Sequence, residues 1–169
     1  RKYKDEKVDR ETMREIVDIA RWAPSWVNYQ IARYTLVDDE EIIKEIAEHG
    51  VNGFVYNIDT LRTAKGVAVL SFVKGKSGTY DKEYITSKGN SWEVFDAGIA
   101  CQTFCLAAHA KGVGTCIMGV IDDKSIAKIV NLPEDETVAA LIVYGYEDGE
   151  HAAPNKRKDV DEIMRFVDR

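Results

Sequence analysis

The sequence predicts an α+β protein in which a mixed sheet is flanked by helices and one long apolar helix lies at the centre. Three observations support this fold class. Strand-like segments alternate along the chain with segments of helical periodicity. The run Gly66–Val73 has the length and composition of a strand covered on both faces. The segment Ser91–Gly112 is apolar on nearly every side, as is typical of a buried helix.

Length and composition indicate one globular domain that spans residues 1–169. The formal net charge of -6 argues against a general nucleic-acid binder, which carries a basic excess. The odd, unpatterned set of three cysteines favours a reducing compartment, so we predict a cytoplasmic protein. We also see no pattern of a signal peptide or of a membrane span in these residues. Because the chain begins at Arg1 instead of a methionine, we expect that amino-terminal residues are missing from this sequence.

The first half of the chain is predicted to hold three helices and two strands. Asp9 is a suitable cap for a helix with an apolar stripe, and Val8 can pack on Met13. This helix ends before Pro24, since a residue that precedes proline avoids the helical region. The later elements are predicted in the order strand 34–37, helix 40–49, helix 57–64 and strand 66–73.

The second half is organised around the apolar helix. The segment Lys74–Asn90 is polar, bears glycines and lacks clear periodicity, so we predict a mobile loop or lid before the helix. Polar residues interrupt the helix too often for a membrane span, and its small residues would allow close approach of a second subunit. Beyond it we predict a turn or strand at 113–120, a helix from Asp122 or Asp123 to Val130, a strand at 137–146 and an amphipathic end.

No catalytic or metal-binding motif is visible in the chain. Cys101 and Cys105 lie one helical turn apart and could form a metal pair, but no nearby histidine or carboxylate completes a ligand set. We therefore predict no metal site, two small core residues and no catalytic side chain. If the protein is an enzyme, a bound cofactor is expected to supply the chemistry.

Two features favour a phosphorylated cofactor. Basic residues gather at both ends of this acidic chain, where solvated termini are the alternative interpretation. The loop Pro24–Gln30 brings several hydrogen-bonding side chains together, where a capped turn is the alternative.

Read together, five segments resemble the FMN-dependent nitroreductase family. They occur in the family's order and cover essentially the whole chain: RKY at the start, APSxxNxQ at 23–30, FDAGIAxQ at 95–102, LAAHAKGVGTCIMG at 106–119 and NKRKDVDEI from Asn155. The resemblance implies a nitroreductase-like sandwich and an intertwined homodimer with one FMN in each of two interface clefts.

The resemblance also implies which residues contact the flavin. Arg1 matches the last basic residue of an amino-terminal phosphate-side clamp, and Asn57 matches an asparagine that bonds the pyrimidine edge. The backbone at Met118 and Gly119 would lie along the ring. A loop from the partner subunit would supply Pro24, Ser25, Trp26 and Asn28, and the phosphate ligands would be Arg157 with Lys158 or Lys156.

Two departures from the family pattern bear on the substrate. The chain continues as Gln30-Ile31-Ala32 where Q-P-W is frequent, and Trp26 stands where a small residue is common. Trp26 could therefore narrow the pocket over the ring, which affects the expected substrate more than the cofactor.

The sequence as a whole predicts an FMN-dependent oxidoreductase. It would take a hydride from NADH or NADPH and reduce a flat acceptor such as a nitroaromatic or a quinone. The alternatives are a specialised dehydrogenase or flavin-processing enzyme of the same fold, a flavin-binding storage or sensor module without turnover, and a structural dimer whose basic ends are merely solvated.

Overall fold

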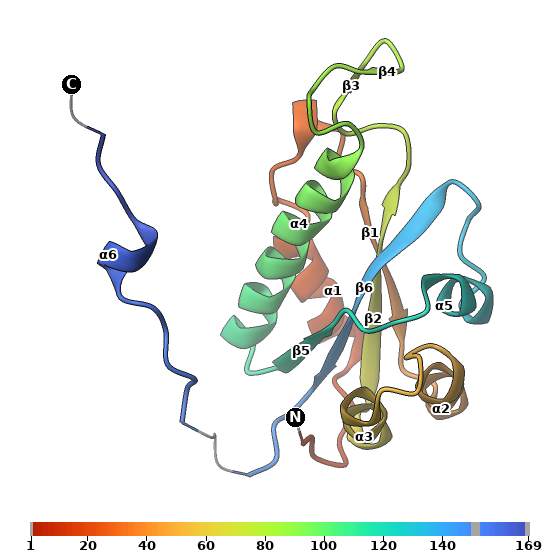
Figure 1. Ribbon diagram of the computed structural model, residues 1–169. Helices are drawn as coiled ribbons and strands as arrows, with labels where there is room; N and C mark the ends of the chain where they lie inside the picture. Colours follow the sequence, from red (N-terminus) through yellow and green to blue (C-terminus); the bar gives the residue numbers. More distant parts are fainter. Residues whose placement is uncertain (1, 150–152, 168–169) are drawn as a thin grey trace.

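The computed structural model describes residues 2–149 and 153–167 of the chain. Its centre is a four-stranded sheet with the order β1-β2-β6-β5 (Figure 1). The strands are β1 Ala32–Val37, β2 Gly66–Val73, β5 Gly114–Met118 and β6 Glu136–Gly145. All three pairings are antiparallel, whereas we predicted a mixed sheet. The alternation of helices and strands gave that prediction, and helical connections can join antiparallel strands as well as parallel ones.

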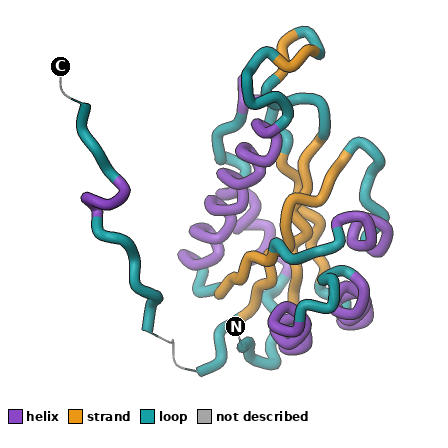
Figure 2. Tube along the Cα trace, viewed as in Figure 1, coloured by secondary structure: helices purple, strands orange, loops and turns teal. Residues whose placement is uncertain are grey.

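Helices cover both faces of this sheet, as the fold class predicted (Figure 2). On one face lie α1 Arg10–Ala20 and α4 Ser91–Ala110. On the other lie α2 Glu40–His49, α3 Val55–Thr63 and α5 Asp123–Ile129. The protein is therefore a three-layer α+β sandwich.

Alternation along β2 divides the hydrophobic core into two layers. Ala68, Leu70 and Phe72 pack with α1 and α4, and Val67 and Val69 pack with the helices of the opposite face. Because successive side chains of a strand point to opposite faces, both halves of the run GVAVLSFV are buried. Each fully buried large apolar side chain contributes about 1.5–3 kcal/mol to stability. The prediction of a strand covered on both faces is confirmed.

Aspartates cap the amino-terminal ends of α1, α2, α5 and α6 among the described helices, and two of these caps were predicted. Asp9 accepts a hydrogen bond from the Thr12 backbone N–H at 2.8 Å, and Asp122 accepts one from Ser125 N–H at 3.0 Å. Asp39 caps α2 in the same way. A cap of this kind stabilises a helix by about 1 kcal/mol. Gly112, with φ 74, ends α4 in the left-handed region that favours glycine.

The helix α4 is covered on only one side within the chain. Ala97, Ala100, Phe104 and Ala107 face α1 and the sheet and are buried. On the opposite side, Val94, Phe95 and Leu106 are 60%, 57% and 60% exposed. The prediction of a helix buried on all sides therefore holds for one face. Among the described helices, none is long and apolar enough to cross a bilayer.

The segment between β2 and α4 is more regular than we predicted. It contains a small hairpin, β3 Thr79–Tyr80 with β4 Glu83–Tyr84, and Ser77 and Thr79 within it are buried. A short hairpin therefore replaces the predicted loop at its four strand residues, and the role of the segment as a lid stays a prediction. Strands this short leave no alternating apolar pattern in the sequence, and their anchors lie elsewhere, on α4.

Residues 153–167 form a tail that stands apart from the sandwich, on the side of α4 (Figure 1). The tail contains one short helix, α6 Val160–Ile163, and each of its described residues is exposed. The apolar side chains of the predicted amphipathic end, Val160, Ile163, Met164 and Val167, are among them. The tail thus makes no contribution to the two described core layers.

Candidate functional site

The loop Pro24–Gln30 contains a 3-10 turn, η1 Trp26–Asn28, and adopts a strained backbone conformation. Val27, Asn28 and Gln30 have φ values of 44, 57 and 50°. The left-handed region costs an L-residue roughly 1–2 kcal/mol, and β-branched valine is especially unsuited to it. A conformation of this kind persists only where surrounding contacts impose it.

Contacts with two other segments hold this loop. The Trp26 backbone N–H donates to Asp96 Oδ2 of α4 at 2.9 Å, and the Trp26 indole N–H donates to the Thr79 carbonyl at 3.2 Å. The Trp26 ring also lies 5.0 Å from the ring of Trp92. Within the loop, Ser25 Oγ accepts a hydrogen bond from Gln30 N–H at 2.8 Å. Hydrogen bonds to α4 and to the segment before it therefore hold the loop in place.

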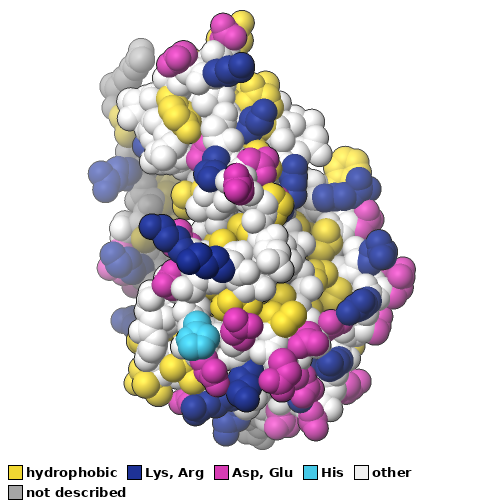
Figure 3. Space-filling view, turned by 90° about the vertical axis from the view of Figure 1, so that its right-hand side faces the viewer, with side chains coloured by type: hydrophobic (Ala, Val, Ile, Leu, Met, Phe, Trp, Pro, Cys, Tyr) yellow, Lys and Arg dark blue, Asp and Glu magenta, His cyan; other side chains and the backbone are white. Residues whose placement is uncertain are grey.

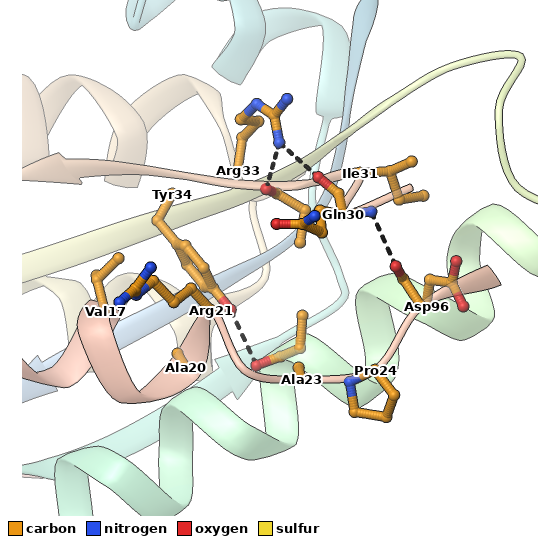
Figure 4. Close-up of a pocket in the computed structure, with 13 residues that line it drawn as sticks. Val17, Ala20, Arg21, Ala23, Pro24, Gln30, Ile31, Arg33, Tyr34 and Asp96 are labelled. Atoms are coloured by element: carbon orange, nitrogen blue, oxygen red, sulfur yellow. Dashed lines mark hydrogen bonds between the residues drawn. The ribbon is translucent and has the colours of Figure 1, made fainter. Parts of the chain in front are cut away.

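A cavity of about 280 Å³ lies behind this loop, between α1, β1 and α4 (Figure 4). Tyr34 reaches across it and donates its hydroxyl to the Ala100 carbonyl at 3.0 Å. Burial raises the pKa of Tyr34, so the hydroxyl remains a donor at neutral pH. Arg33 donates to the Gln30 and Ala32 carbonyls, which stiffens the exit of the loop. Residues from the loop that line the cavity include Pro24, Ser25 and Gln30.

A second group of predicted site residues lies where β5 ends. Asn57 on α3 is buried, and its Nδ2 donates to the Val120 carbonyl at 3.0 Å. This bond fixes the chain immediately after Met118 and Gly119. Met118 is buried, whereas the space beside Gly119 is open, since a Cβ built there would meet nothing within 4 Å. The structure thus brings Asn57, Met118 and Gly119 together and leaves a backbone surface accessible.

The two groups lie at opposite ends of the chain's fold. The loop Pro24–Gln30 packs beside the start of α4, whereas α3 lies at the far end of the molecule (Figure 1). Arg157 and Lys158 are in the exposed tail, where Arg157 Nη1 donates to the Asn155 carbonyl at 3.0 Å. Arg1 lies outside the described residues. One chain by itself therefore does not assemble the predicted set into one site.

Two of the cysteines lie on α4, where we predicted small core residues. Cys101 is buried in the core, Cys105 is half-buried, and both are free thiols. Hydrogen bonding between the two thiols, with a second bond from Thr115, lowers the pKa of Cys105, whereas the pKa of Cys101 is raised. Among the described residues there is no cluster of three or more His, Cys, Asp or Glu side chains suited to a metal ion.

Four residues that position these segments were missed by the sequence analysis. Asp96 and Glu93 are both buried on α4, and their carboxylates accept hydrogen bonds from the loop segments. Ser77 and Thr79 are the buried partners on the hairpin side. The available signal was the presence of two carboxylates in an otherwise apolar helix, which we used only to exclude a membrane span.

Comparison with known proteins assigns this sandwich, with its exposed Gly119 backbone beside Asn57, to a class of oxidoreductases. The chain is a member of the nitroreductase family, whose sequence profile matches residues 1–146.

Individual relatives agree with this assignment. A protein of Bacillus subtilis described as a NAD(P)H nitroreductase is 24% identical over 187 residues, covering 95% of this chain and 89% of its own. An iodotyrosine deiodinase of Thermotoga neapolitana is 24% identical over 155 residues, covering 88% and 83%. The structure of an FMN-dependent nitroreductase from Clostridium difficile superposes with a TM-score of 0.77 at 27% identity, covering 98% of this chain and 91% of that one.

Proposed function

We propose that the protein is an FMN-dependent oxidoreductase that takes a hydride from NADH or NADPH and reduces a flat acceptor such as a nitroaromatic or a quinone. The names of the relatives support the electron donor and the cofactor. We further propose that two copies of the chain share each site. In this arrangement the loop Pro24–Gln30 of one copy meets Asn57 and Gly119 of the other.

The observation that carries this proposal is the separation of two complementary half-sites on one chain. A flavin needs donors and acceptors for its pyrimidine edge, a flat surface for its ring and cations for its phosphate. The buried Asn57 amide beside the open backbone at Gly119 fits the first two requirements. The tail contacts neither core layer and exposes Arg157 and Lys158. These two cations fit the requirement of the phosphate if the tail crosses to another copy.

The surface of the molecule is consistent with association through α4. The face formed around α2 and α5 carries basic and acidic side chains interspersed with each other (Figure 3). On these two helices, Glu41, Lys44, Glu48 and Lys124 are exposed. The outer face of α4 is instead apolar, with Val94, Phe95 and Leu106 exposed. Apolar patches of this kind mark interaction sites, so α4 is the better candidate for the contact between copies.

Within the shared site each side chain has a separate task. Asn57 orients the pyrimidine edge, Arg157 and Lys158 neutralise the phosphate, and Ser25 and Asn28 approach from the second copy. Trp26 forms a wall that limits the shape of the acceptor. Bound FMN supplies the hydride and electron transfer, so the protein positions ring and acceptor and need not form a covalent bond to either.

Reduction of the purified protein tests the function. We expect a yellow protein that releases FMN on denaturation. Under anaerobic conditions NADH or NADPH should bleach the visible absorbance, and a quinone or a nitro compound should restore it. A flavin that neither nucleotide reduces within minutes would favour the storage or sensor alternative. A colourless protein that does not bind added FMN would contradict the proposal altogether.

The state of association is tested separately. Light scattering at micromolar concentration should give about twice the chain mass, as expected for the commonest type of oligomer. Dilution that produces monomers should release the flavin. A monodisperse monomer that retains FMN would contradict the shared site and, with it, the roles of Ser25 and Asn28.

A further inference from the structure

Asp96 occupies a position that links two segments far apart in the sequence. It lies on α4, is 3% exposed, and uses one oxygen, Oδ2, for two hydrogen bonds. The Trp26 backbone N–H donates to it at 2.9 Å, and the Ser77 hydroxyl donates to it at 2.5 Å. Ser77 is fully buried, so its hydroxyl has no access to water as an alternative partner.

The contact at Trp26 reaches the loop immediately before its strained residues. Val27, Asn28 and Gln30 all lie in the left-handed region. A second contact reinforces the first, since the Trp26 indole N–H donates to the carbonyl of Thr79, two residues after Ser77. Trp26 is therefore held at its backbone by Asp96 and at its side chain by the segment Ser77–Thr79.

Glu93 provides a natural comparison one turn earlier on α4. It is also buried, and its Oε1 accepts hydrogen bonds from the Gly75 N–H at 2.6 Å and the Tyr84 hydroxyl at 3.1 Å. Both of these donors belong to the segment between β2 and α4. Glu93 thus anchors that segment alone, whereas Asp96 anchors it together with the loop Pro24–Gln30.

We propose that Asp96 is a positioning residue that holds the loop Pro24–Gln30 in its strained conformation and couples it to the segment Lys74–Asn90. The consequence for catalysis rests on the proposed function. Ser25 and Asn28 would present their side chains to the flavin of a second copy only in this conformation. A change in the conformation of the segment Lys74–Asn90 would then alter the loop Pro24–Gln30, and the reverse, because both are bonded to the Asp96 carboxylate.

Amide hydrogen exchange in the flavin-free protein tests the positioning role. In the wild-type protein the Trp26 amide should be protected although it lies in a surface loop. Asp96→Ala should accelerate exchange at residues 26–30 and 77–79 by about tenfold or more, because both segments lose a hydrogen bond to a charged group. Asp96→Asn, whose amide can still accept from Trp26 N–H and pair with Ser77, should stay close to wild type.

Two further variants separate coupling from general loss of stability. Glu93→Ala should accelerate exchange at residues 75–84 and leave residues 26–30 unchanged. Ser77→Ala should accelerate exchange at residues 77–79 and, to a smaller degree, at 26–30, because the carboxylate loses the donor that orients it. An unprotected Trp26 amide in the wild type would overturn the proposal even if Asp96→Ala fails to fold. Unchanged exchange at 26–30 in Ser77→Ala would overturn the coupling.

Titration with FMN tests the consequence for the cofactor. Asp96→Ala should weaken FMN binding by about tenfold, Asp96→Asn should restore it, and Glu93→Ala should leave it near the wild-type value. Equal losses in Asp96→Ala and Glu93→Ala would overturn the link to the cofactor. If the wild-type protein binds no FMN, the proposed function fails, and the exchange measurements still decide whether Asp96 couples the two segments.

Discussion

The helix α4 and the tail 153–167 both expose apolar side chains, but only α4 has its conformation imposed by the rest of the chain. Phe104 on the inner face of α4 is fully buried and stacks on Tyr34 at 5.2 Å. In the tail, Ile163, Phe166 and Val167 are exposed. A chain can therefore present one partner surface that is already formed and another whose conformation its own core does not determine. The second kind is expected to gain its structure on binding.

The largest effect should separate the two faces of α4. Phe104→Ala removes a buried ring and should lower the free energy of unfolding by about 3–5 kcal/mol. Leu106→Ala, two residues away on the exposed face, should change the folding of the single chain by no more than about 0.5 kcal/mol. Urea unfolding over a range of protein concentrations measures both. The loss in Leu106→Ala should depend on concentration, because that side chain is expected to act through association. If Phe104→Ala and Leu106→Ala lowered the free energy of unfolding equally at all protein concentrations, the distinction between the two faces of α4 would be contradicted.

The next effect concerns the tail. Arg157→Ala should weaken FMN binding by roughly tenfold to a hundredfold, because a hydrogen bond to a charged group is worth roughly 1.5–3 kcal/mol. Affinity for riboflavin, which lacks the phosphate, should hardly change. Arg165→Ala, another exposed arginine of the tail, is the matched control. If FMN and riboflavin lose affinity equally, Arg157 is not the phosphate ligand.

A smaller effect is expected where the loop meets α4. Trp26→Ala should shift the relative rates with bulky and small acceptors by roughly tenfold or less, since pocket shape discriminates only modestly. The backbone N–H that donates to Asp96 remains in this variant, so the loop should keep this hydrogen bond although it loses the indole contact with Thr79. Tyr29→Ala removes an exposed ring from the same loop and serves as the control. Steady-state rates with a set of quinones measure the ratio, and an unchanged ratio would show that Trp26 does not line the site.

The smallest expected effect is the contribution of one ion pair, in the rigid part of the fold, to the free energy of unfolding. Arg10 donates two hydrogen bonds to Asp38, at 2.7 and 2.9 Å, and holds the pKa of Asp38 below its usual value. Because the folded-state pKa is lowered, this stabilisation is present above about pH 4 and is lost as the pH falls through the folded-state pKa.

Removing the Asp38 carboxylate tests the predicted direction of this pH dependence. Asp38→Asn should destabilise the protein by about 0.5–1 kcal/mol at neutral pH and progressively less as the medium becomes more acidic. Thermal unfolding between neutral and acidic pH measures the difference. Asp18→Asn, which removes an exposed partner of Arg21, should have a smaller effect at every pH. A difference for Asp38→Asn that grows on acidification would contradict the assignment.

Much of the fold could be predicted because its elements carry local signals. The helix Glu40–His49 and the strand Gly66–Val73 were predicted with the bounds that the structure has, since periodicity and flanking glycines mark both. The direction of the strands could not be predicted in this way. A helix between two strands in the sequence does not state whether the second strand runs parallel or antiparallel to the first.

The candidate site was less accessible from the sequence. The proximity of Asn57 to Met118 and Gly119 was implied by family resemblance, and the Asn57–Val120 bond gives it a physical basis. Asp96 escaped notice because one of its partners is a backbone N–H, which has no residue signature, and the other is a serine distant in sequence. Contacts of this type become visible only when the chain is folded.

The strand order has a consequence for synthesis. The central pair of the sheet joins β2 to β6, with Val67 opposite Val143, although several other elements lie between these two strands in the sequence. A ribosome that has released β2 must still make the hairpin, α4, β5 and α5 before β2 obtains its inner neighbour. Throughout that interval the apolar residues on both faces of β2 have an incomplete layer beside them. Long-range pairing of this kind is slow and exposes the chain to aggregation. The growing chain is therefore expected to depend on chaperones or on rapid release from the ribosome.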